Sequence, residues 1–396
     1  MRHISSDIVV VGAGPAGSLA AKTAAENDVH VLLLEEHPRV GQPVHCAEGL
    51  SQQGIADAGL EPKLPIVSQE IQKARIYAPD KNYIELGSTK LGGFILNRDA
   101  FDIALAEKAV MAGAELRTST KVTDVIRVGD KIVGVRALDN DGTLEIRSKV
   151  VIGADGQASV VRTRSGFRRW FPDVIPCAQY RLGGLNIEDP EINECHLGRE
   201  IAPGGYAWVF PKSSEEANVG LGVRKYNVGP PIDYLRKFVD SDPRFRGAEI
   251  RLINGGLCPI SGTIERIVDN GVMLAGDAAG QLIPMTGAGI HLAIIAGRMA
   301  GEVAAEAVVE GNASAVRLQR YAHMFNASWG RRIEDSRKMV EMFDRFEDRD
   351  LNTLAKIISS EDILNLANGT NVGRTLTRLV SRAPLGILRL MRAYLR

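Results

Sequence analysis

The sequence predicts an α/β fold, α+β overall, in which one layered unit is assembled from separate parts of the chain. Apolar runs ended by glycine-rich turns occur at 8–11, 150–153 and 272–275, and such runs are typical of strands buried in a parallel sheet. Between them lie stretches of alternating apolar and polar residues, a pattern typical of antiparallel strands. From about residue 314 the pattern becomes helical and charged. We therefore expect a discontinuous Rossmann-like domain, an inserted antiparallel sheet and a C-terminal helical appendage.

The first apolar run leads into a segment with the composition of a dinucleotide phosphate-binding turn, Gly12-Ala13-Gly14-Pro15-Ala16-Gly17. Gly12 makes the tight turn, Gly14 lets backbone approach a pyrophosphate, and Gly17 allows close helix packing. The pyrophosphate then lies at the positive end of a helix dipole. The next strand, 30–34, ends in Glu35, close to the spacing of about 20 residues expected for the ribose-binding acid. A plain strand-to-helix turn is the alternative, and the joint register of strand, glycines, helix and acid favours nucleotide binding.

Two later segments bear on which nucleotide is bound, since NAD and FAD share this phosphate geometry. Segments 150–156 and 272–280 are apolar strands that end in the glycine-flanked acids Asp155 and Asp277. Both segments resemble the glutathione-reductase-like flavoprotein superfamily, in its para-hydroxybenzoate hydroxylase branch. The resemblance implies FAD, with Asp277 on the ribityl chain and 284–290 beneath the flavin ring. A helix that starts near Gly289 and Ile290 would point its backbone N–H groups at the pyrimidine edge.

The order of these segments predicts the domain organisation. A chain of 396 residues exceeds one ordinary core, so two domains and an appendage are expected. The FAD-binding domain would comprise residues 1–66, 93–164 and 263–313. The substrate domain would comprise 67–92 and 165–262, and the helical region 314–396.

Composition excludes several classes of function. The formal net charge is zero, so no overall field would attract nucleic acid, and we expect no nucleic-acid partner. Four dispersed cysteines, Cys46, Cys177, Cys195 and Cys258, lack CxxC spacing, which predicts neither a disulfide scaffold nor a metal site. A reducing cytoplasm is the expected location. No segment reads as a membrane span, because the most apolar one, 282–309, carries charged residues and His291. We interpret that histidine as a helix-packing residue.

An aromatic segment narrows the substrate. It reads Tyr206-Ala-Trp208-Val-Phe210-Pro211 and is followed eight residues later by Gly220-Leu-Gly222. Strand alternation puts the three aromatic rings on one face, as a wall for a long apolar ligand, with ordinary core packing as the alternative. Together with Cys46-Ala47-Glu48-Gly49-Leu-Ser, the segment resembles the geranylgeranyl reductase family over about residues 4–300. Archaeal members saturate the isoprenoid chains of digeranylgeranylglycerol phospholipids, and plant and bacterial relatives act on the chlorophyll tail.

This resemblance implies roles for further residues. Cys46, Ala47 and Gly49 would lie near the flavin, Arg98 would meet the FAD phosphates, and Val122 would offer backbone groups to the adenine. The substrate site would comprise Tyr206, Trp208, Phe210, Pro211, Gly220 and Gly222. The alternative for Cys46 is a small buried apolar residue, and for Arg98 a solvated charge at a helix start.

The implied activity is FAD-dependent saturation of geranylgeranyl chains. A hydride from flavin N5 would reach one carbon of a double bond, and a proton would reach the other. An isolated alkene is poorly electrophilic, so the site must exclude water and align the bond. Tyr206, Cys46 or an ordered water remain alternatives as proton donor. Because no second GxGxxG follows a strand, a separate nicotinamide domain is not expected, and NAD(P)H, ferredoxin or another carrier stay open as electron donor.

Two other functions fit the same fold. A flavin monooxygenase or halogenase is one, although halogenases carry a WxWxIP segment from which Tyr206 and Phe210 depart. The other is a non-catalytic prenyl-lipid-binding flavoprotein, which leaves the complete cofactor signatures unexplained. The reductase interpretation accounts for both the cofactor-binding segments and the aromatic segment.

The last stretch, 374–396, carries six arginines and no acidic residue among leucines and other apolar residues. Pro384 is expected to divide it into two short helices. A basic amphipathic helix is typical of a membrane-surface element, with a solvated surface helix as the alternative. A lipid substrate favours peripheral contact at the inner membrane surface.

Overall fold

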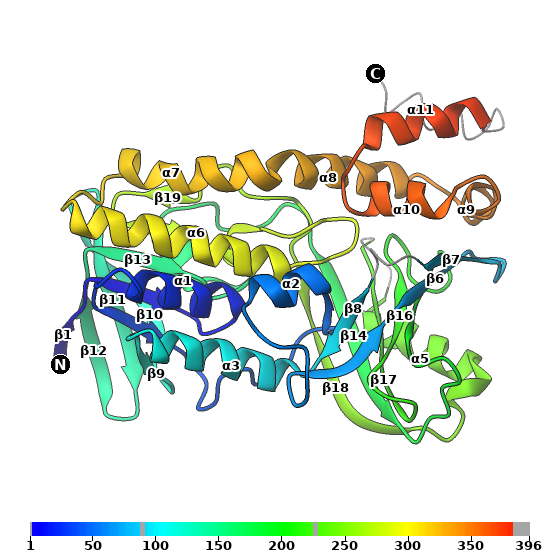
Figure 1. Cartoon of the computed structure of the whole chain (residues 1–396), viewed down its shortest axis with the longest axis horizontal. Coiled ribbons are helices and arrows are strands. Elements are labelled where there is room, and N and C mark those ends of the chain that lie inside the picture. The colour runs from blue at the N-terminus through cyan, green and yellow to red at the C-terminus, as the bar shows by residue number, and fades with distance from the viewer. Residues whose placement is uncertain (1, 88–91, 225–228, 383–396) are drawn as a thin grey trace.

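The computed structural model describes residues 2–87, 92–224 and 229–382 and has two sheet-based halves beneath a row of helices (Figure 1). A six-stranded sheet is the core of the first half, in the order β19-β20-β13-β2-β3-β9. The three predicted apolar runs form its neighbouring strands β2 (Ile8–Val11), β13 (Val150–Gly153) and β20 (Val272–Leu274), which pair in parallel and are fully buried. The remaining strands are β3 (Val31–Leu34), β9 (Glu115–Arg117) and the short antiparallel β19 (Val268–Asp269). The predicted α/β class is confirmed.

Helices α1 (Pro15–Ala25) and α6 (Ile290–Val309) cross at unusually short range in this half, and α3 (Arg98–Met111) packs beside α1. A Cβ atom on Gly297 would lie 2.1 Å from the carbonyl oxygen of Ala16, and one on Gly301 would lie 2.3 Å from that of Ala20. Glycine therefore permits the contact. The starts of both helices consequently border one cavity.

Two smaller sheets extend this half. One has the order β1 (Arg2–Ser5), β12 (Gly142–Arg147), β11 (Lys131–Asp139) and β10 (Lys121–Val128), and its parallel β1–β12 pair was not predicted. The other contains β4 (Gly49–Ser51), β8 (Gly93–Leu96) and β5 (Val67–Ile71). Since β5 pairs with β8, strand pairing crosses the expected domain boundary near residue 67.

A seven-stranded sheet forms the second half. Its order is β18 (Glu249–Cys258), β14 (Ile175–Gly183), β17 (Glu216–Gly222), β16 (Ala207–Pro211), β15 (Ile192–His196), β6 (Lys73–Tyr77) and β7 (Tyr83–Gly87). All neighbours are antiparallel, as expected, except β15 and β6, which pair in parallel. The two strands come from distant parts of the chain, so no short hairpin fixes their direction. Helix α5 (Pro231–Ser241) covers one face.

Helices account for the rest of the described chain. Helix α7 (Ala315–Phe325) continues through a π-helical segment at Asn326–Gly330 into α8 (Arg331–Phe343), along the top of Figure 1. Short helices are α2 (Gln52–Asp57), α4 (Val160–Arg164), α9 (Asp348–Ala355), α10 (Ser360–Ala367) and α11 (Val372–Arg382). Within residues 2–382, outside the two undescribed gaps, no helix combines the length and apolarity needed to cross a membrane.

Candidate active site

A cavity of about 800 Å³ lies between the two halves, beneath the C-terminal helices. One wall comes from the glycine-rich turn before α1, the start of α6 and the segment after β20. The opposite wall comes from the seven-stranded sheet, and α9 and α10 contribute apolar side chains. The volume falls within the range of about 300–1,000 Å³ common for ligand pockets.

The glycine-rich turn has the shape that a pyrophosphate needs. Gly12 adopts φ +96°, and a Cβ there would lie 2.5 Å from the carbonyl oxygen of Ala154. A Cβ on Gly17 would lie 1.8 Å from the carbonyl oxygen of Gly12, so both positions demand glycine for packing. No atom lies within 4 Å of a Cβ built on Gly14, which leaves open space over the N-terminus of α1. The turn therefore fits a dinucleotide phosphate.

Two residues expected near the adenosine lie outside the cavity lining. The Glu35 carboxylate accepts hydrogen bonds from the backbone N–H groups of Ala13 and His37, both at 3.0 Å. The Thr120 N–H donates to the Glu35 carbonyl at 2.8 Å, which brings the start of β10, with Val122, beside this turn. Val122 itself is buried in β10.

Asp277 lies on the cavity beside the start of α6. A Cβ on Gly289, the residue before that helix, would lie 3.3 Å from Asp277 Oδ1, and Ile290 is the first helical residue. Burial raises the pKa of the Asp277 carboxyl group above its ordinary value. Within the described part of the chain, its side chain has no hydrogen-bond partner. A carboxyl group in this state suits a ligand hydroxyl, as the ribityl chain of FAD requires.

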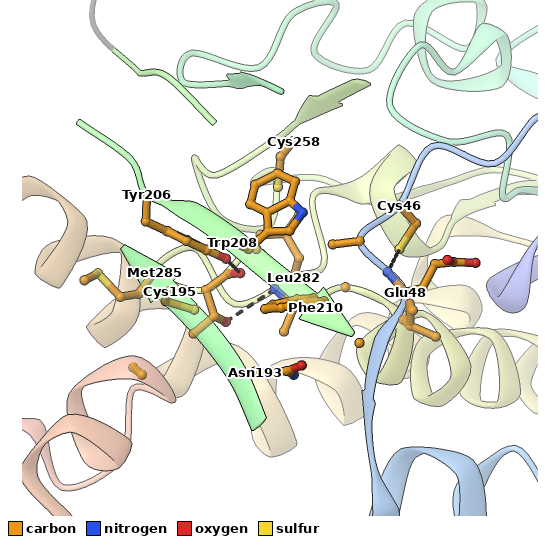
Figure 2. A pocket seen from close by; sticks show the side chains of 18 of the residues that line it. Cys46, Glu48, Asn193, Cys195, Tyr206, Trp208, Phe210, Cys258, Leu282 and Met285 are labelled. Carbon is orange, nitrogen blue, oxygen red and sulfur yellow. Dashed lines mark hydrogen bonds between the residues drawn. The ribbon is translucent and has the colours of Figure 1, made fainter. Parts of the chain in front are cut away.

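The turn that carries Cys46 has an unusual backbone. Glu48 adopts φ +73°, a left-handed conformation that is uncommon outside glycine. Its N–H donates to Cys46 Sγ at 3.2 Å, as Figure 2 shows. Burial raises the pKa of the Cys46 thiol, and the nearby Arg98 guanidinium opposes this only in part. The thiol therefore keeps its proton at neutral pH.

A buried charge cluster fixes this turn against the sheet. Glu48 is fully buried, and its Oε2 accepts hydrogen bonds from Lys212 Nζ at 2.6 Å, Asn218 Nδ2 at 2.7 Å and Arg181 Nη2 at 3.1 Å. Its Oε1 accepts from the Arg98 backbone N–H at 2.9 Å. Each partner offsets part of the cost of burying the carboxylate. No local sequence pattern indicated a role for Glu48 or Lys212.

Arg98 borders the cavity, as expected for a residue that meets the FAD phosphates. Its Nε and Nη2 form two hydrogen bonds with Asp102, at 2.8 and 2.7 Å, one helical turn away. Paired bonds of this kind fix the plane of the guanidinium group. Arg98 is therefore an oriented and partly buried cation, and the alternative of a solvated charge is wrong.

The aromatic segment contributes three rings to the same cavity. The centroids of Tyr206 and Trp208 lie 5.9 Å apart, and those of Trp208 and Phe210 lie 6.4 Å apart. Tyr206 immediately precedes β16, and its hydroxyl group donates to the carbonyl oxygen of Thr286 at 2.6 Å. Figure 2 shows Trp208 between Tyr206 and the Cys46–Glu48 turn. The intervening residues Ala207 and Val209 are buried in the core beneath α5.

Three other residues expected at the substrate site support this wall from behind. A Cβ on Gly220 would lie 2.5 Å from Trp208 Cζ2, so this glycine makes room for the indole ring. A Cβ on Gly222 would lie 2.5 Å from Ile175 Cγ2, and Gly222 borders an adjoining chamber of about 120 Å³. Pro211 is buried at the end of β16 and lines neither space. These three residues therefore lie behind the aromatic rings and do not form the surface of the large cavity.

The structure also brings together residues that looked dispersed in the sequence. All four cysteines border the large cavity. Sequence spacing gave no signal for this convergence, because the four come from the Cys46 turn and three different strands. Across residues 2–382, apart from the two gaps, no group of three or more His, Cys, Asp or Glu side chains suits a metal ion. His291 pairs with Asp57 at 2.7 Å, which agrees with a packing role.

Both halves of the chain are similar to known protein families. Residues 5–194 match the model of an FAD binding domain, and residues 173–257 match the geranylgeranyl reductase catalytic domain. A digeranylgeranylglycerophospholipid reductase of Methanothrix thermoacetophila is 42% identical over 90% of this chain and 92% of its own length. The chain belongs to the geranylgeranyl reductase family. A second relative, digeranylgeranylglycerophospholipid reductase 2 of Methanococcoides burtonii, is 40% identical over 88% of this chain and 87% of its own length.

Solved structures agree with this family assignment. A geranylgeranyl bacteriochlorophyll reductase-like protein of Thermoplasma acidophilum matches with a TM-score of 0.89 at 31% identity, over 98% of this chain and 99% of that chain. A flavin-dependent brominase matches with a TM-score of 0.73 at 22% identity, over 92% and 94%, and shares the fold alone. The expected FAD cofactor and the expected class, a flavin-dependent oxidoreductase that acts on carbon–carbon double bonds, are confirmed.

Proposed function

We propose that this chain saturates the geranylgeranyl chains of a digeranylgeranylglycerol phospholipid. One observation carries the proposal. The same cavity is lined on one side by the glycine-rich turn before α1 and on the other by the aromatic rings of the sheet. The names of the relatives support the lipid class. An apolar chain in this cavity gains free energy by leaving water, and the rings and aliphatic side chains supply the surface.

Different residues would hold the cofactor and align the substrate. When bound, reduced FAD supplies the hydride, and the glycine-rich turn, Arg98 and Asp277 would hold the cofactor. Trp208 and Phe210 would align the isoprenoid chain and exclude water, which an unactivated double bond requires. Alignment of this kind accounts for much of the rate in reactions of two bound partners.

We propose Cys46 as the proton donor ahead of Tyr206. Burial raises the pKa of both groups, so each holds its proton at neutral pH. The Tyr206 proton is committed to the Thr286 carbonyl oxygen. Cys46 Sγ accepts a hydrogen bond from the Glu48 N–H, lies near the Arg98 guanidinium group and borders the cavity. Its proton is therefore the one available to a substrate carbon.

Anaerobic reduction of a lipid tests the activity. The dithionite-reduced protein is incubated with digeranylgeranylglycerol phosphate lipid in detergent, and the product is weighed by mass spectrometry. We expect a gain of two hydrogens for each double bond reduced. Incorporation of oxygen or halide under air would instead indicate a monooxygenase or halogenase, and an unchanged lipid would indicate a carrier. Repeating the assay with NADPH, NADH or reduced ferredoxin in place of dithionite identifies the physiological donor.

We further propose peripheral contact with anionic lipid through residues 374–396. Within the described part, the apolar residues Val372, Leu376 and Leu379 of α11 are buried against other helices, while Arg374 is exposed. Contact through α11 would therefore use Arg374, because Arg378 pairs with the buried Asp362. The division expected at Pro384 lies outside the described residues. Co-sedimentation with anionic vesicles should weaken when the chain is cut after Ala383, and undiminished binding would reject the proposal.

A further inference from the structure

Three side-chain amides from adjacent strands hold the Cys46 turn against the seven-stranded sheet. Asn254 of β18 donates to the carbonyl oxygen of Val44 at 2.9 Å. Gln179 of β14 donates to that of Cys46 at 3.0 Å, and Asn218 of β17 donates to that of Ala47 at 3.2 Å. The position of the turn therefore follows the geometry of the sheet.

Gln179 differs from the other two amides because it also binds the aromatic wall. Its Oε1 accepts a hydrogen bond from Trp208 Nε1 at 2.8 Å, while its Nε2 donates to the Cys46 carbonyl. Gly220 lies between the two residues in strand register, opposite Gln179 on β14 and opposite Trp208 on β16. Since Gly220 has no Cβ, the indole ring can reach across it. One side chain, 3% exposed, thus joins two parts of the cavity wall.

We propose that Gln179 is a positioning residue that fixes the Cys46 thiol relative to the Trp208 indole. The role it would serve in reduction rests on the proposed function. A primary amide is well suited to this place, because it offers a donor to the carbonyl group and an acceptor to the indole N–H. An apolar side chain would leave both buried groups without a partner, which costs more than the bond itself contributes.

The variant Gln179→Glu gives a readout that a purely structural role would not produce. Its protonated carboxyl group can donate to the Cys46 carbonyl and accept from Trp208, so it reproduces both bonds. Once ionised, the carboxylate can only accept hydrogen bonds, so it loses the bond to the Cys46 carbonyl oxygen that it faces. Gln179→Met removes both bonds at every pH. Tyr180→Phe is the matched control, since Tyr180 follows on β14 and is buried in the core on the opposite face.

The measurement is the rate at which N-ethylmaleimide labels Cys46, followed by peptide mass mapping in the full-length flavoprotein. Cys177, Cys195 and Cys258 serve as references within the same cavity. Each variant is compared with the unmodified chain at the same pH. We expect Gln179→Met to change the relative Cys46 rate by about threefold to tenfold. At low pH the relative Cys46 labelling rate of Gln179→Glu should equal that of the unmodified chain. As the new carboxyl group ionises, this rate should approach that of Gln179→Met.

The same variants separate this inference from the proposed function. If labelling behaves as expected and the unmodified chain reduces no lipid, the positioning role stands and the proposed function fails. Where lipid is reduced, kcat of Gln179→Glu should fall with rising pH while FAD content stays constant. Unchanged Cys46 labelling in Gln179→Met, or a Gln179→Glu rate ratio independent of pH, would overturn the inference. Should Gln179→Met fail to fold, the pH dependence of the Gln179→Glu rate ratio still decides it.

Discussion

The two walls of the cavity are built in different ways. The nucleotide wall uses backbone atoms and the absence of side chains, as at Gly12, Gly14 and Gly17, which lie within six residues of one another. The sheet wall uses side chains such as Gln179 and Asn218, which bind the Cys46 turn more than a hundred residues away in the sequence. A local motif thus specifies one wall, and the assembled tertiary structure specifies the other. Substitutions in the two walls should therefore fail in different ways.

The largest effect is expected in the nucleotide wall. Gly17→Val would drive its side chain into the Gly12 carbonyl oxygen, 1.8 Å from the Cβ position, and should abolish both folding and FAD binding. Gly14→Val meets no protein atom within 4 Å of its Cβ. It should leave the unfolding free energy of the apoprotein nearly unchanged while FAD affinity falls. Thermal melting with and without added FAD measures both effects, and equal destabilisation of the two apoproteins would contradict this distinction.

The charge cluster gives the next largest effect, on stability. Glu48→Ala leaves Lys212 and Arg181 without their buried carboxylate and should lower the unfolding free energy by about 3–5 kcal/mol. Denaturant unfolding checks this value. Glu85→Gln is the control, because Glu85 pairs with Lys73 and Arg75 at the surface, and its loss should lower the unfolding free energy far less than Glu48→Ala does. Adding Lys212→Met to Glu48→Ala should restore part of the loss, and a further loss would contradict the account.

Cys46 tests the chemistry of the turn that the sheet wall holds in place. Cys46→Ala should lower kcat about 100-fold, at the lower end for a lost proton donor, while FAD content stays constant. In the unmodified chain, kcat should stay constant as pH rises through 9.0, the ordinary thiol pKa, because burial raises the pKa of Cys46. The rate should fall only at higher pH, where the thiol loses its proton. A fall centred at or below pH 9.0, or a fully active Cys46→Ala, would remove Cys46 from this role.

The smallest effect is expected at Tyr206. Tyr206→Phe loses one hydrogen bond to Thr286 and should raise KM by a factor of about two to ten. Tyr206→Ala also removes the ring and should raise KM further while the protein stays yellow. Steady-state kinetics with a geranylgeranyl lipid measure both variants. A loss of kcat in Tyr206→Phe larger than that in Cys46→Ala would make Tyr206 the proton donor instead.

The contrast between the walls also explains what the sequence could predict. The glycine turn, the Asp277 segment and the alternation around Trp208 are local patterns, and the structure places them on one cavity. Lys212 and Gln179 carry no local signal, because their partners are chosen by strand order and register. The same reason accounts for the parallel β15–β6 pair and for the convergence of the cysteines. Gly220 is the clearest example. It makes room for the Trp208 ring to reach Gln179, and this role depends on its pairing with both residues in the sheet.

The most direct test of a flavin facing a prenyl-lipid slot is the colour of the flavin itself. The protein is reduced by one equivalent of dithionite without oxygen, and its absorbance is followed after addition of a digeranylgeranylglycerol lipid. The account predicts that the yellow colour returns as the lipid is reduced, and that a fully saturated diphytanylglycerol lipid leaves the flavin bleached. A flavin that stays bleached with both lipids, or is reoxidised equally by both, would contradict it.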